Sequence, residues 1–352
     1  MNQRTEQEIM KHWEIHDKPL VSICCTAYNH ELYITEAIES FLMQETDFPF
    51  EVLVHDDCST DDTANIIREY EKKYPNIIKP IYQKENQYSK GVKITPIVIK
   101  RSVSKYIALC EGDDYWTDPE KLQTQLDLML ENPECHLSFH PADEVIDGKL
   151  SGRVYADHET ENRVFADVEM VRRIGGSFCP TASMVIHREV MDPTPDFFTT
   201  VPVGDVFLQL LASVNGGALF VPRKMSVYRR GHSGSWTMNM YEKDRISVDS
   251  LIKNREKYIT EYIRSLDELG NFIDQKYRKK IDKKISKRLV TLSILYLGNY
   301  RYEAFQEMIV QSHETYKITS LPHALLYYFR FAPHLLRVLV KLGKIIQSKR
   351  VR

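Results

Sequence analysis

The sequence of 352 residues predicts an α/β protein with a doubly wound, mostly parallel sheet and a helical extension at its C-terminal end. Between residues 19 and 111, apolar runs rich in β-branched residues alternate with stretches of helical periodicity, an order typical of βα units. After about residue 240 the alternation stops and only helical periodicity remains. We therefore expect three parts: a polar N-terminal extension (1–18), an α/β domain (19–240) and a basic helical region (241–352).

The α/β domain opens with a buried strand and an amphipathic helix. Residues 20–28, LVSICCTAY, form an unbroken apolar run, which predicts a central strand covered by helices on both faces. Residues 31–44 then place apolar side chains at helical spacing. These side chains are Leu32, Ile34, Ala37, Ile38, Phe41 and Leu42.

The same pattern repeats along the next sixty residues. A strand at 51–55 ends in Asp56 and Asp57. Ser59 or Asp61 can then cap the helix that follows. The remaining elements expected in this part are a helix to about Lys73, a strand near 78–82, a helix near 94–104 and a strand at 105–110.

Polar, acidic or aromatic residues follow three of these strands directly. Ligands bind at the carboxyl ends of the strands in open α/β sheets, so we expect the three clusters to line one crevice. No GxGxxG or GxxxxGK[ST] pattern supplies a glycine cradle for phosphate. Adjacent carboxylates can neutralise a phosphate through a bound divalent cation instead. The three clusters are Thr26-Ala27-Tyr28-Asn29, Asp56-Asp57 and Glu111-Gly112-Asp113-Asp114.

The adjacent acids Asp113 and Asp114 are the sharpest feature of the sequence. A surface turn that caps a helix is the simpler interpretation, because Thr117-Asp118-Pro119-Glu120 is a good helix start. However, that start lies separately, beyond the aromatic pair Tyr115-Trp116. Two like charges side by side are unfavourable unless a cation or a hydroxyl-rich ligand lies between them, which favours a binding site.

Several motifs in residues 19–236 occur in an order that resembles the family 2 glycosyltransferases, inverting enzymes with the GT-A fold. They include LVSICCTAYNHELYITEAIESFLMQ, EVLVHDDCSTDDT and YIALCEGDDYWTDPEKLQTQ. Cys58 stands where the family usually has glycine, which permits a positive φ more readily than cysteine does. The resemblance implies transfer of a hexose or N-acetylhexosamine from a nucleotide-diphosphate sugar, most often a UDP-sugar. The acceptor would be a hydroxyl in polysaccharide, capsule or lipopolysaccharide biosynthesis.

The resemblance also assigns roles in binding the nucleotide sugar. Thr26, Tyr28 and Asn29 would contact the nucleotide, with Tyr28 stacking on the base. Asp57 would accept a hydrogen bond from the ring N–H of the base, and a uracil ring offers one such donor and an apolar face. The simpler alternatives are that Tyr28 packs at a strand end and that Asp57 caps a helix.

The metal assignment comes from the same resemblance. Asp113 would face the ribose and contribute to the metal site, and Asp114 would bind a Mn²⁺ or Mg²⁺ ion that bridges the diphosphate. The stretch Tyr228-Arg229-Arg230-Gly231-His232 resembles a family motif whose His joins the metal shell, but it is one residue longer. His232 is therefore either a metal ligand or an exposed loop residue.

Three positions could act on the reacting sugar and the acceptor. The resemblance makes Asp205, at the start of an apolar helix, the general base, since an inverting transfer needs one carboxylate to take the proton of the acceptor hydroxyl. Asp205 could instead only cap that helix. Thr181 and Ser183, in a Pro-Thr-Ala-Ser turn before a short strand, are weaker candidates for the sugar pocket.

The remaining candidates are aromatic and basic. Arg229 and Arg230 could pair with phosphate oxygens. Lys90 is a weaker phosphate candidate and could equally be a solvated loop lysine. Trp116 and Trp236 complete the expected pocket for the sugar or the acceptor.

Charge is divided unevenly between the two ends of the chain. The formal net charge is −2, but residues 241–352 carry 23 Lys+Arg and 12 Asp+Glu, which leaves −13 for residues 1–240. The last segment interleaves apolar and aromatic residues with Lys and Arg and has no acid after Glu314. This composition is typical of an interfacial helix on an anionic membrane. A solvated helix face, packing on the catalytic domain and packing on a second subunit, and thus an oligomer, are the alternatives.

Composition also bounds the class of protein and its location. With 43% hydrophobic and 27% charged residues, the chain is expected to fold, and no stretch approaches the roughly 20 apolar residues of a membrane span. The N-terminus shows no apolar core of a signal peptide. The six cysteines form no CxxC pair, so we expect reduced, buried thiols in a cytoplasmic protein, peripheral at most to the membrane.

Three other functions are compatible with parts of the sequence. A sugar-nucleotide or glycan-binding scaffold without turnover would keep the same nucleotide residues. A nucleic-acid module would use the Lys/Arg runs, but no helix-turn-helix, zinc finger or RNA-binding motif accompanies them, so we expect no nucleic-acid partner. A nucleotidyltransferase would need a glycine-rich phosphate loop with a lysine, and this sequence has no such loop. We therefore expect the partners to be a nucleotide-sugar donor and a glycan or lipid-linked glycan acceptor.

Overall fold

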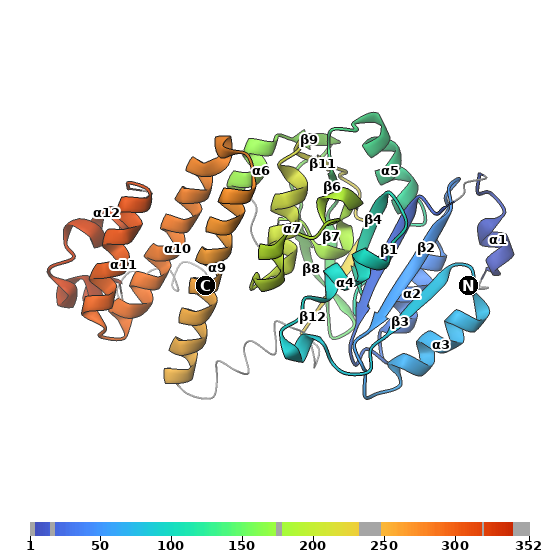
Figure 1. The fold of residues 1–352 in the computed structure, drawn as a ribbon, viewed down its shortest axis with the longest axis horizontal. Coiled ribbons are helices and arrows are strands. Elements are labelled where there is room, and N and C mark those ends of the chain that lie inside the picture. Colours follow the sequence, from blue (N-terminus) through green and yellow to red (C-terminus); the bar gives the residue numbers. More distant parts are fainter. Residues whose placement is uncertain (1–3, 15–17, 174–177, 232–247, 319, 341–352) are drawn as a thin grey trace. The chain divides into compact units, whose positions relative to one another are not determined.

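The computed structural model describes residues 4–14, 18–173, 178–231, 248–318 and 320–340 (Figure 1). The chain forms two compact units. The first unit comprises residues 1–199 and 203–239, and the second comprises residues 200–202 and 240–352. The expected division of labour between a catalytic domain and a basic extension stays a prediction.

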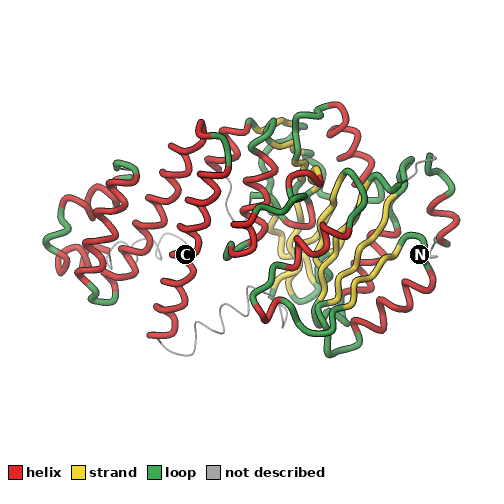
Figure 2. Tube along the Cα trace, in the orientation of Figure 1, coloured by secondary structure: helices red, strands yellow, loops and turns green. Residues whose placement is uncertain are grey.

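The first unit is built on an eight-stranded mixed sheet, whose strands Figure 2 shows in yellow. Its strand order is β3-β2-β1-β4-β10-β6-β11-β9, and the four strands at the β3 end run parallel. These four lie close to their expected positions, and β1, β2 and β4 are buried, largely apolar runs long enough to be recognised alone. They are β1 (Val21–Ala27), β2 (Phe50–Asp56), β3 (Ile78–Tyr82) and β4 (Tyr106–Glu111).

The other half of the sheet mixes directions. Strand β10 is antiparallel to both β4 and β6, β11 is parallel to β6, and β9 is antiparallel to β11. Strands of three residues carry too little periodicity to be predicted reliably. These strands are β10 (Val185–His187), β6 (Leu137–Phe139), β11 (Ala218–Phe220) and β9 (Arg163–Phe165).

A second sheet of four strands was not expected from the sequence. Its order is β5-β12-β7-β8, and it joins the segment after the acidic pair to the segment that precedes residue 231. The strands are β5 (Tyr115–Trp116), β12 (Ser226–Arg230), β7 (Ala142–Ile146) and β8 (Lys149–Tyr155).

Helices cover the large sheet. Helix α2 is amphipathic and buries Ile34, Ile38 and Phe41, as its apolar spacing predicts. The helices of this unit are α1 (Glu6–Met10), α2 (Ile34–Leu42), α3 (Thr63–Lys73), α4 (Ile94–Arg101), α5 (Lys121–Glu131), α6 (Asp167–Arg173) and α7 (Gly204–Ser213). Short 3₁₀ turns are η1 (Tyr88–Lys90), η2 (Thr181–Ser183), η3 (Arg188–Val190) and η4 (Asp196–Thr200).

The N-terminal segment packs on the first unit. Thr5 caps α1 in a capping box with Glu8, and Ile9 is buried. The Arg4 guanidinium donates to the backbone oxygens of Leu42 and Gln44, each at 2.8 Å. The polar start of the chain is therefore anchored to the domain by α1 and its flanking residues.

The parallel register brings three strand ends to one edge of the sheet. Ala27 of β1 pairs with Asp56 of β2, and Thr26 pairs with Glu111 of β4. The ladder continues past the strands, since the amide of Asp57 donates to the Ala27 oxygen at 2.9 Å. The expectation that the three polar clusters share one edge is confirmed.

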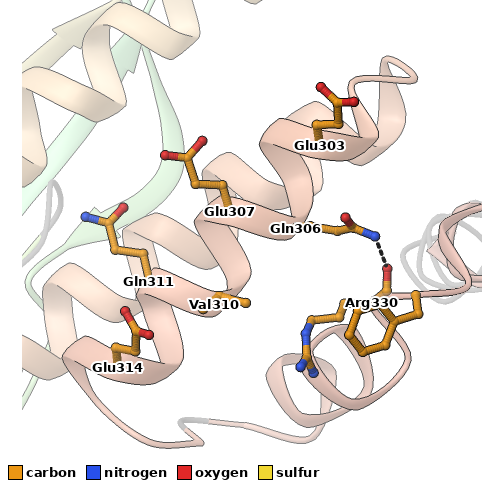
Figure 3. A pocket seen from close by; sticks show the side chains of 8 residues that line it. Glu303, Gln306, Glu307, Val310, Gln311, Glu314 and Arg330 are labelled. Carbon is orange, nitrogen blue, oxygen red and sulfur yellow. Dashed lines mark hydrogen bonds between the residues drawn. The ribbon is translucent and has the colours of Figure 1, made fainter.

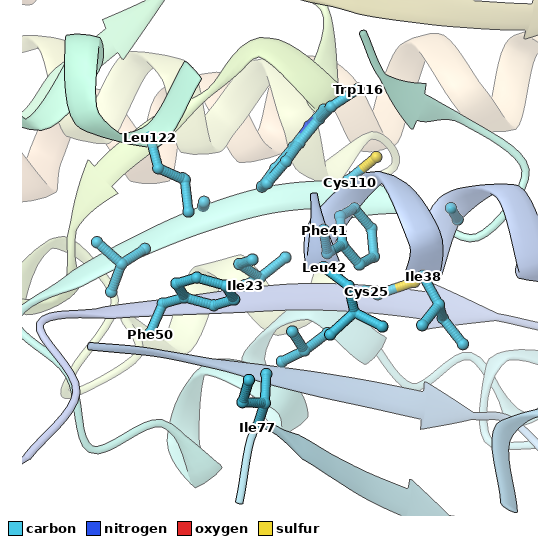
Figure 4. Close-up of a cluster of buried hydrophobic side chains, with 14 of the residues drawn as sticks. Ile23, Cys25, Ile38, Phe41, Leu42, Phe50, Ile77, Cys110, Trp116 and Leu122 are labelled. Atoms are coloured by element: carbon cyan, nitrogen blue, oxygen red, sulfur yellow. The ribbon is translucent and has the colours of Figure 1, made fainter. Parts of the chain in front are cut away.

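A dense apolar core lies between the sheet and its helices (Figure 4). Trp116 is 1% exposed, and its ring packs edge-on against Phe41 at a centroid distance of 4.9 Å. Among the described residues all six cysteines are free thiols, and only Cys58 is not fully buried. The expectation of unpaired thiols is confirmed for this part of the chain.

Lys121 is fully buried in this core. Its ammonium lies 4.1 Å from the Trp116 ring centroid and donates to Gln125 Oε1 at 2.7 Å. Burial lowers the pKa of Lys121 from its ordinary 10.5 to about 7.

The second unit is helical. Its core gathers Leu297, Phe305, Ile309 and Leu326, and a shallow hollow lies between one face of α11 and the Arg330-Phe331 pair (Figure 3). The helices are α9 (Val248–Phe272), α10 (Arg278–Gly298), α11 (Tyr302–Thr315) and α12 (Leu321–Tyr328), with a 3₁₀ turn η5 (Gln275–Tyr277) before α10. None of the helices described in the chain has both the length and the apolar character to cross a membrane.

We predict that Lys121 makes stability depend on pH. Between pH 7 and 10.5 the unfolded chain binds one proton more at this amine than the folded chain does. With respect to this amine, the free energy of unfolding is therefore highest above pH 10.5 and falls as the pH falls to about 7. Urea titrations should show the free energy of unfolding of the wild type rising relative to that of Lys121→Met between pH 7 and 10. A difference that stays constant with pH would contradict the buried-amine assignment.

Candidate active site

The loops after β1 and β2 are tied together by Asn29. Its side-chain oxygen accepts from the backbone amide of Thr60 at 2.8 Å, and its backbone amide donates to Ser59 Oγ at 2.9 Å. Asn29 adopts φ 55°, a left-handed conformation that asparagine tolerates well. Asn29 therefore shapes the site by joining two loops.

Cys58 adopts the left-handed conformation that its sequence position suggested. Its φ is 62°, at the position where a glycine would carry no steric cost. The turn keeps its shape because the amide of Ser59 donates to the carboxylate of Asp56 at 3.3 Å. The glycine-to-cysteine departure thus leaves the turn intact and stores strain in it.

Asp57 anchors a third loop. The carboxylate is buried, and its two oxygens accept from the amides of Gln87 and Tyr88 at 2.8 and 2.9 Å. Each carboxylate oxygen has a second lone pair, so a base N–H can still bind there. Asp57 therefore positions the turn η1, and its expected role toward the base stays a prediction.

Exposed aromatic rings flank this edge of the sheet. Tyr28, directly after β1, is 43% exposed, and Tyr88 in η1 is 54% exposed. Thr26 is half-buried on β1. The exposed ring of Tyr28 suits stacking on a planar base.

The end of β4 presents three acids. Asp114 is 2% exposed, and its Oδ1 accepts from the amide of Arg229 at 2.8 Å. Gly112 permits a close approach here, because a Cβ on it would lie 2.9 Å from His30 Nδ1 and 3.0 Å from Ile34 Cδ1. The loop can thus tuck beside α2 while Asp113 and Asp114 remain at the sheet edge.

Burial and mutual repulsion perturb these acids. Burial raises the pKa of Glu111 most, the negative charges of Asp113 and Asp205 raise it further, and it reaches about 8. Burial, followed by the charges of Asp113 and Glu111, raises the pKa of Asp114 well above its usual range. The carboxyls at this edge therefore form one negative field.

The carboxylate set fits a hard divalent cation. Mg²⁺ and Mn²⁺ prefer carboxylate oxygens, and Mg²⁺ is usually held by one or two carboxylates together with substrate phosphates. Among the described residues no three His, Cys, Asp or Glu side chains converge to hold a metal. Asp113 and Asp114 therefore suit a cation that a nucleotide diphosphate helps to hold.

Asp205 lies in the first turn of α7, facing the same acids. Its charge acts on Glu111 and on the thiol of Cys179. Burial raises the pKa of Asp205, while the amide of Val206, which donates to Oδ1 at 2.8 Å, acts in the opposite direction. Asp205 thus belongs to the site and also satisfies an amide at the start of its helix.

The three basic candidates all have acidic partners. Arg229 donates to Glu36 Oε2 and to the backbone oxygen of Asp113, each at 2.5 Å. Arg230 donates to the buried Glu144 at 3.0 Å, and Lys90 pairs with Glu85. Arg230 and Lys90 are exposed enough to keep N–H donors available for a phosphate, whereas Arg229 is mostly buried and already bonded on both terminal nitrogens.

The Arg229 guanidinium is also enclosed by rings. It lies 4.7 Å from the ring centroid of Tyr33 and 5.0 Å from that of Tyr115. Together with its bonds to Glu36 and Asp113, these contacts make Arg229 a brace between α2, β12 and the acidic loop. The sequence did not indicate this role, since Glu36 and Arg229 lie far apart along the chain.

The expected pocket residues fall in different places. Trp116 lies in the core and cannot present its ring to an acceptor; instead its Nε1 donates to the Ala182 oxygen at 2.9 Å. Ser183 is fully buried, and Thr181 is half-buried in η2. His232 and Trp236 lie outside the described residues.

Sequence reasoning missed Glu36 and the Gln87-Tyr88 amides, and it placed Glu111 at the expected edge without giving it a role. Glu111 had a signal, since it ends an apolar strand two residues before Asp113. Glu36 and the amides had none, because a helix-surface glutamate and a loop amide look the same wherever they occur.

Residues 22–192 match the model of the family described as Glycosyl transferase family 2. An uncharacterized protein of Mycobacterium tuberculosis is 35% identical to the chain over 218 residues, which make up 61% of this chain and 60% of that protein. The chain thus spans about 60% of the length of the curated relatives that it matches in M. tuberculosis and Mycobacterium bovis.

Two glycosyltransferases of known structure are also similar. The poly(ribitol-phosphate) beta-N-acetylglucosaminyltransferase TarS of Staphylococcus aureus is 35% identical over 97 residues, 27% of this chain and 16% of that protein. The crystal structure of TarS 1–349 with UDP-GlcNAc matches with a TM-score of 0.64 and 16% identity, over 92% of each chain.

The mannosyltransferase PcManGT from Pyrobaculum calidifontis, in complex with GDP-Man and Mn²⁺, matches with a TM-score of 0.51 and 14% identity, over 96% of this chain and 89% of that one. Likeness at this level of identity concerns the fold. The expected GT-A fold with C-terminal helices is confirmed.

We predict that the strain at Cys58 can be measured. A left-handed φ destabilises the folded state of a residue with a Cβ by about 1–2 kcal/mol. Glycine avoids this cost but loses more backbone entropy on folding, which lowers its advantage by about 0.5–1 kcal/mol. Cys58→Gly should therefore equal or exceed the wild type in stability. Cys58→Val, with a β-branched side chain, should lose about 1–2 kcal/mol. Urea unfolding of the three proteins measures this order, and equal stability of the Val and Gly variants would contradict it.

Proposed function

Because this chain carries a glycosyl transferase family 2 domain over residues 22–192, we propose that it is an inverting glycosyltransferase that uses a nucleotide-diphosphate sugar. The observation that carries the proposal is the meeting of Asp113, Asp114 and Asp205 at one edge of the sheet. Asp113 and Asp114 follow β4, Asp205 opens α7, and the charges of Asp113 and Asp205 both act on Glu111. A transferase needs this pair of functions, a cation site and a base.

The proposed donor is a UDP-sugar. Tyr28 offers an exposed ring for the base, and Asp57 offers carboxylate oxygens already oriented by two backbone amides. A uracil complements them with an apolar face and one imide N–H. TarS, a structural neighbour, was crystallised with UDP-GlcNAc, which supports the same choice.

Asp113 and Asp114 would hold the proposed Mn²⁺ or Mg²⁺ ion, and the ion would neutralise charge on the departing diphosphate. The neighbour PcManGT was solved with Mn²⁺, which supports a divalent metal. The amide of Arg229 holds Asp114 Oδ1, so the carboxylate is oriented before any ligand arrives. The brace from Arg229 to Glu36 keeps that amide in place.

Asp205 would take the proton of the acceptor hydroxyl as that oxygen attacks the anomeric carbon. Burial raises the pKa of Asp205, which makes its carboxylate a stronger base than an exposed aspartate. A single displacement then releases the nucleoside diphosphate and inverts the anomeric configuration, so no second carboxylate is needed as nucleophile.

The proposed acceptor is a hydroxyl of a cell-surface polysaccharide intermediate. TarS bears the name of a poly(ribitol-phosphate) beta-N-acetylglucosaminyltransferase, and this chain is 35% identical to it over 97 residues. The sugar pocket would be bounded by the turn 181–183, where Thr181 is the half-buried candidate.

We further propose that the C-terminal segment docks on an anionic membrane. Large apolar side chains are exposed along α12 and the residues after it, while Leu326 and Leu336 point into the unit's core. Eight Lys and Arg and no acid follow Glu314, so two copies of this surface would repel and an anionic bilayer would attract it. The exposed side chains are Leu321, Leu325, Tyr328, Phe329, Phe331, Leu335, Val338 and Leu339.

The hollow beside α11 marks the limit of that surface. Glu303, Glu307 and Glu314 line it and would be repelled by anionic headgroups (Figure 3). The docking face would therefore consist of the exposed sides of α12 and residues 335–339.

We predict that turnover of UDP-sugars with Mn²⁺ depends on Asp114 and Asp205. Asp205→Asn should lower kcat by about 10²–10⁴-fold, since a general base is lost, and should leave the Kd for UDP nearly unchanged. Asp114→Asn should weaken Mn²⁺-dependent UDP binding as well as turnover. Product release from a panel of UDP-sugars and calorimetry with UDP measure the two effects.

Glu159→Gln, a surface substitution on the same domain outside the proposed site, is the control and should change neither quantity. Full turnover in both aspartate variants would overturn the mechanism. UDP binding in the wild type without hydrolysis or transfer would indicate a binding scaffold instead.

We predict that exposed apolar residues of the tail carry membrane binding. Tyr328→Glu combined with Leu335→Glu should reduce binding to vesicles containing phosphatidylglycerol by about tenfold or more, because both side chains lose apolar contact and gain negative charge. Leu150→Glu, equally exposed on β8, is the matched control. Vesicle co-sedimentation measures the effect. A concentration-dependent dimer that the double variant abolishes, without vesicle binding, would overturn the proposal.

A further inference from the structure

Three buried side chains bind the backbone of residues 179–183. Gln209 Nε2 donates to the Cys179 oxygen at 2.9 Å. Trp116 Nε1 donates to the Ala182 oxygen at 2.9 Å, and Gln125 Nε2 donates to the Ser183 oxygen at 3.0 Å. The donors come from α7, β5 and α5, so the segment is held from three directions.

All three donors are at most 1% exposed. Water cannot replace a lost bond at such sites, so each carbonyl depends on its side-chain partner. Apolar residues at positions 125 and 209 could fill the same space but could not bond these carbonyls; Gln125 uses both ends of its side-chain amide, whereas Gln209 uses Nε2 and its buried Oε1 has no partner among the described residues. The pattern therefore indicates a requirement for the exact path of the backbone.

Lys121 sets the direction of one donor. Its Nζ donates to Gln125 Oε1 at 2.7 Å. The amide nitrogen of Gln125 must then face the Ser183 oxygen and Ser138 Oγ. The same ammonium lies over the Trp116 ring, so one buried cation contacts two of the three donors.

The clamped segment lies between the two groups of carboxylates. It leads into β10, which is antiparallel to β4, and the amide of Leu109 donates to the Met184 oxygen at 3.1 Å, two residues before Glu111. On its other side Gln209 follows Asp205 by one helical turn, and the charge of Asp205 acts on Cys179. The segment therefore touches the elements that carry both groups.

We propose that Trp116, Gln125 and Gln209 are positioning residues that hold residues 179–183 as a fixed spacer between Asp205 and the acids at the end of β4. This inference rests on the proposed transferase function. In an inverting displacement the base and the departing diphosphate lie on opposite sides of one sugar carbon. A shift of about 1 Å between them can cost about 100-fold in rate. The residues proposed to bind the nucleotide lie on and after β1 and β2, outside this segment.

Trp116→Phe and Gln209→Leu test the spacer in the full chain. Each removes one donor, and Trp116→Phe keeps an aromatic ring beside Lys121 and Phe41. Both variants should lower kcat for Mn²⁺-dependent UDP-sugar hydrolysis by about 10- to 100-fold and leave the Kd for UDP within about twofold. Amide hydrogen exchange of residues 181–184 should accelerate. Ser213→Ala is the control, because it removes a buried hydroxyl of α7 that bonds only to the Leu210 oxygen.

The three measurements separate the outcomes. Faster exchange with unchanged kcat in both variants would overturn the spacer role, and unchanged exchange would overturn the clamp itself. If Ser213→Ala loses as much kcat as Gln209→Leu, the loss reflects general destabilisation of α7, and the proposal would be overturned. Absence of UDP binding and hydrolysis in the wild type would instead reject the proposed function, while hydrogen exchange would still report on the clamp.

Discussion

Repulsion among Glu111, Asp113, Asp114 and Asp205 is concentrated where the end of β4 meets the start of α7. Burial and neighbouring negative charge raise the pKa of Glu111 to about 8 and that of Asp114 well above its usual range, so the folded chain spends free energy to bring these groups together. Other contacts offset that cost only in part. The amide of Arg229 bonds Asp114, and its guanidinium is held by Glu36, so the positive charge nearest the acids is already shared with a fifth acid. A cation brought by a ligand would complete the compensation.

The parallel half of the fold was predictable because its information is local. An unbroken apolar run predicts a strand that is buried on both faces. Because β1, β2 and β4 pair in parallel, the residues that follow them necessarily lie at the same edge of the sheet. The sequence also marked the turn at Cys58 as the place where cysteine replaces the usual glycine, and the structure shows that the left-handed φ is kept there. By contrast, strands of three residues such as β6 and β9 exist through pairing with neighbours that are distant in sequence, and no local pattern marks them.

Side-chain direction explains where the site residues diverged from expectation. Trp116 follows the acidic pair by two residues, but the pleat of β5 turns its ring into the core beside Phe41. Asp57 ends a strand as expected, yet it also anchors the amides of Gln87 and Tyr88, which only the tertiary fold brings near. In both cases residue type was informative about the chemistry available, whereas the partner was decided by packing. The sequence therefore identifies the acids of the site more reliably than the groups that hold them.

Charge serves different ends in the two units. In the first unit Asp114 and Asp205 are buried or partly buried and accept from backbone amides, so their charges are weakly screened and act strongly on one another's neighbours. In the second unit the cations of the tail accompany exposed apolar side chains, and Arg330 and Arg337 lie over the rings of Tyr327 and Tyr300. Such stacking leaves the charge accessible while its stem covers an aromatic face. The net charge of −2 thus conceals an acidic first part and a basic second part of the chain, the first proposed to bind a cation with its ligand and the second proposed to meet an anionic membrane.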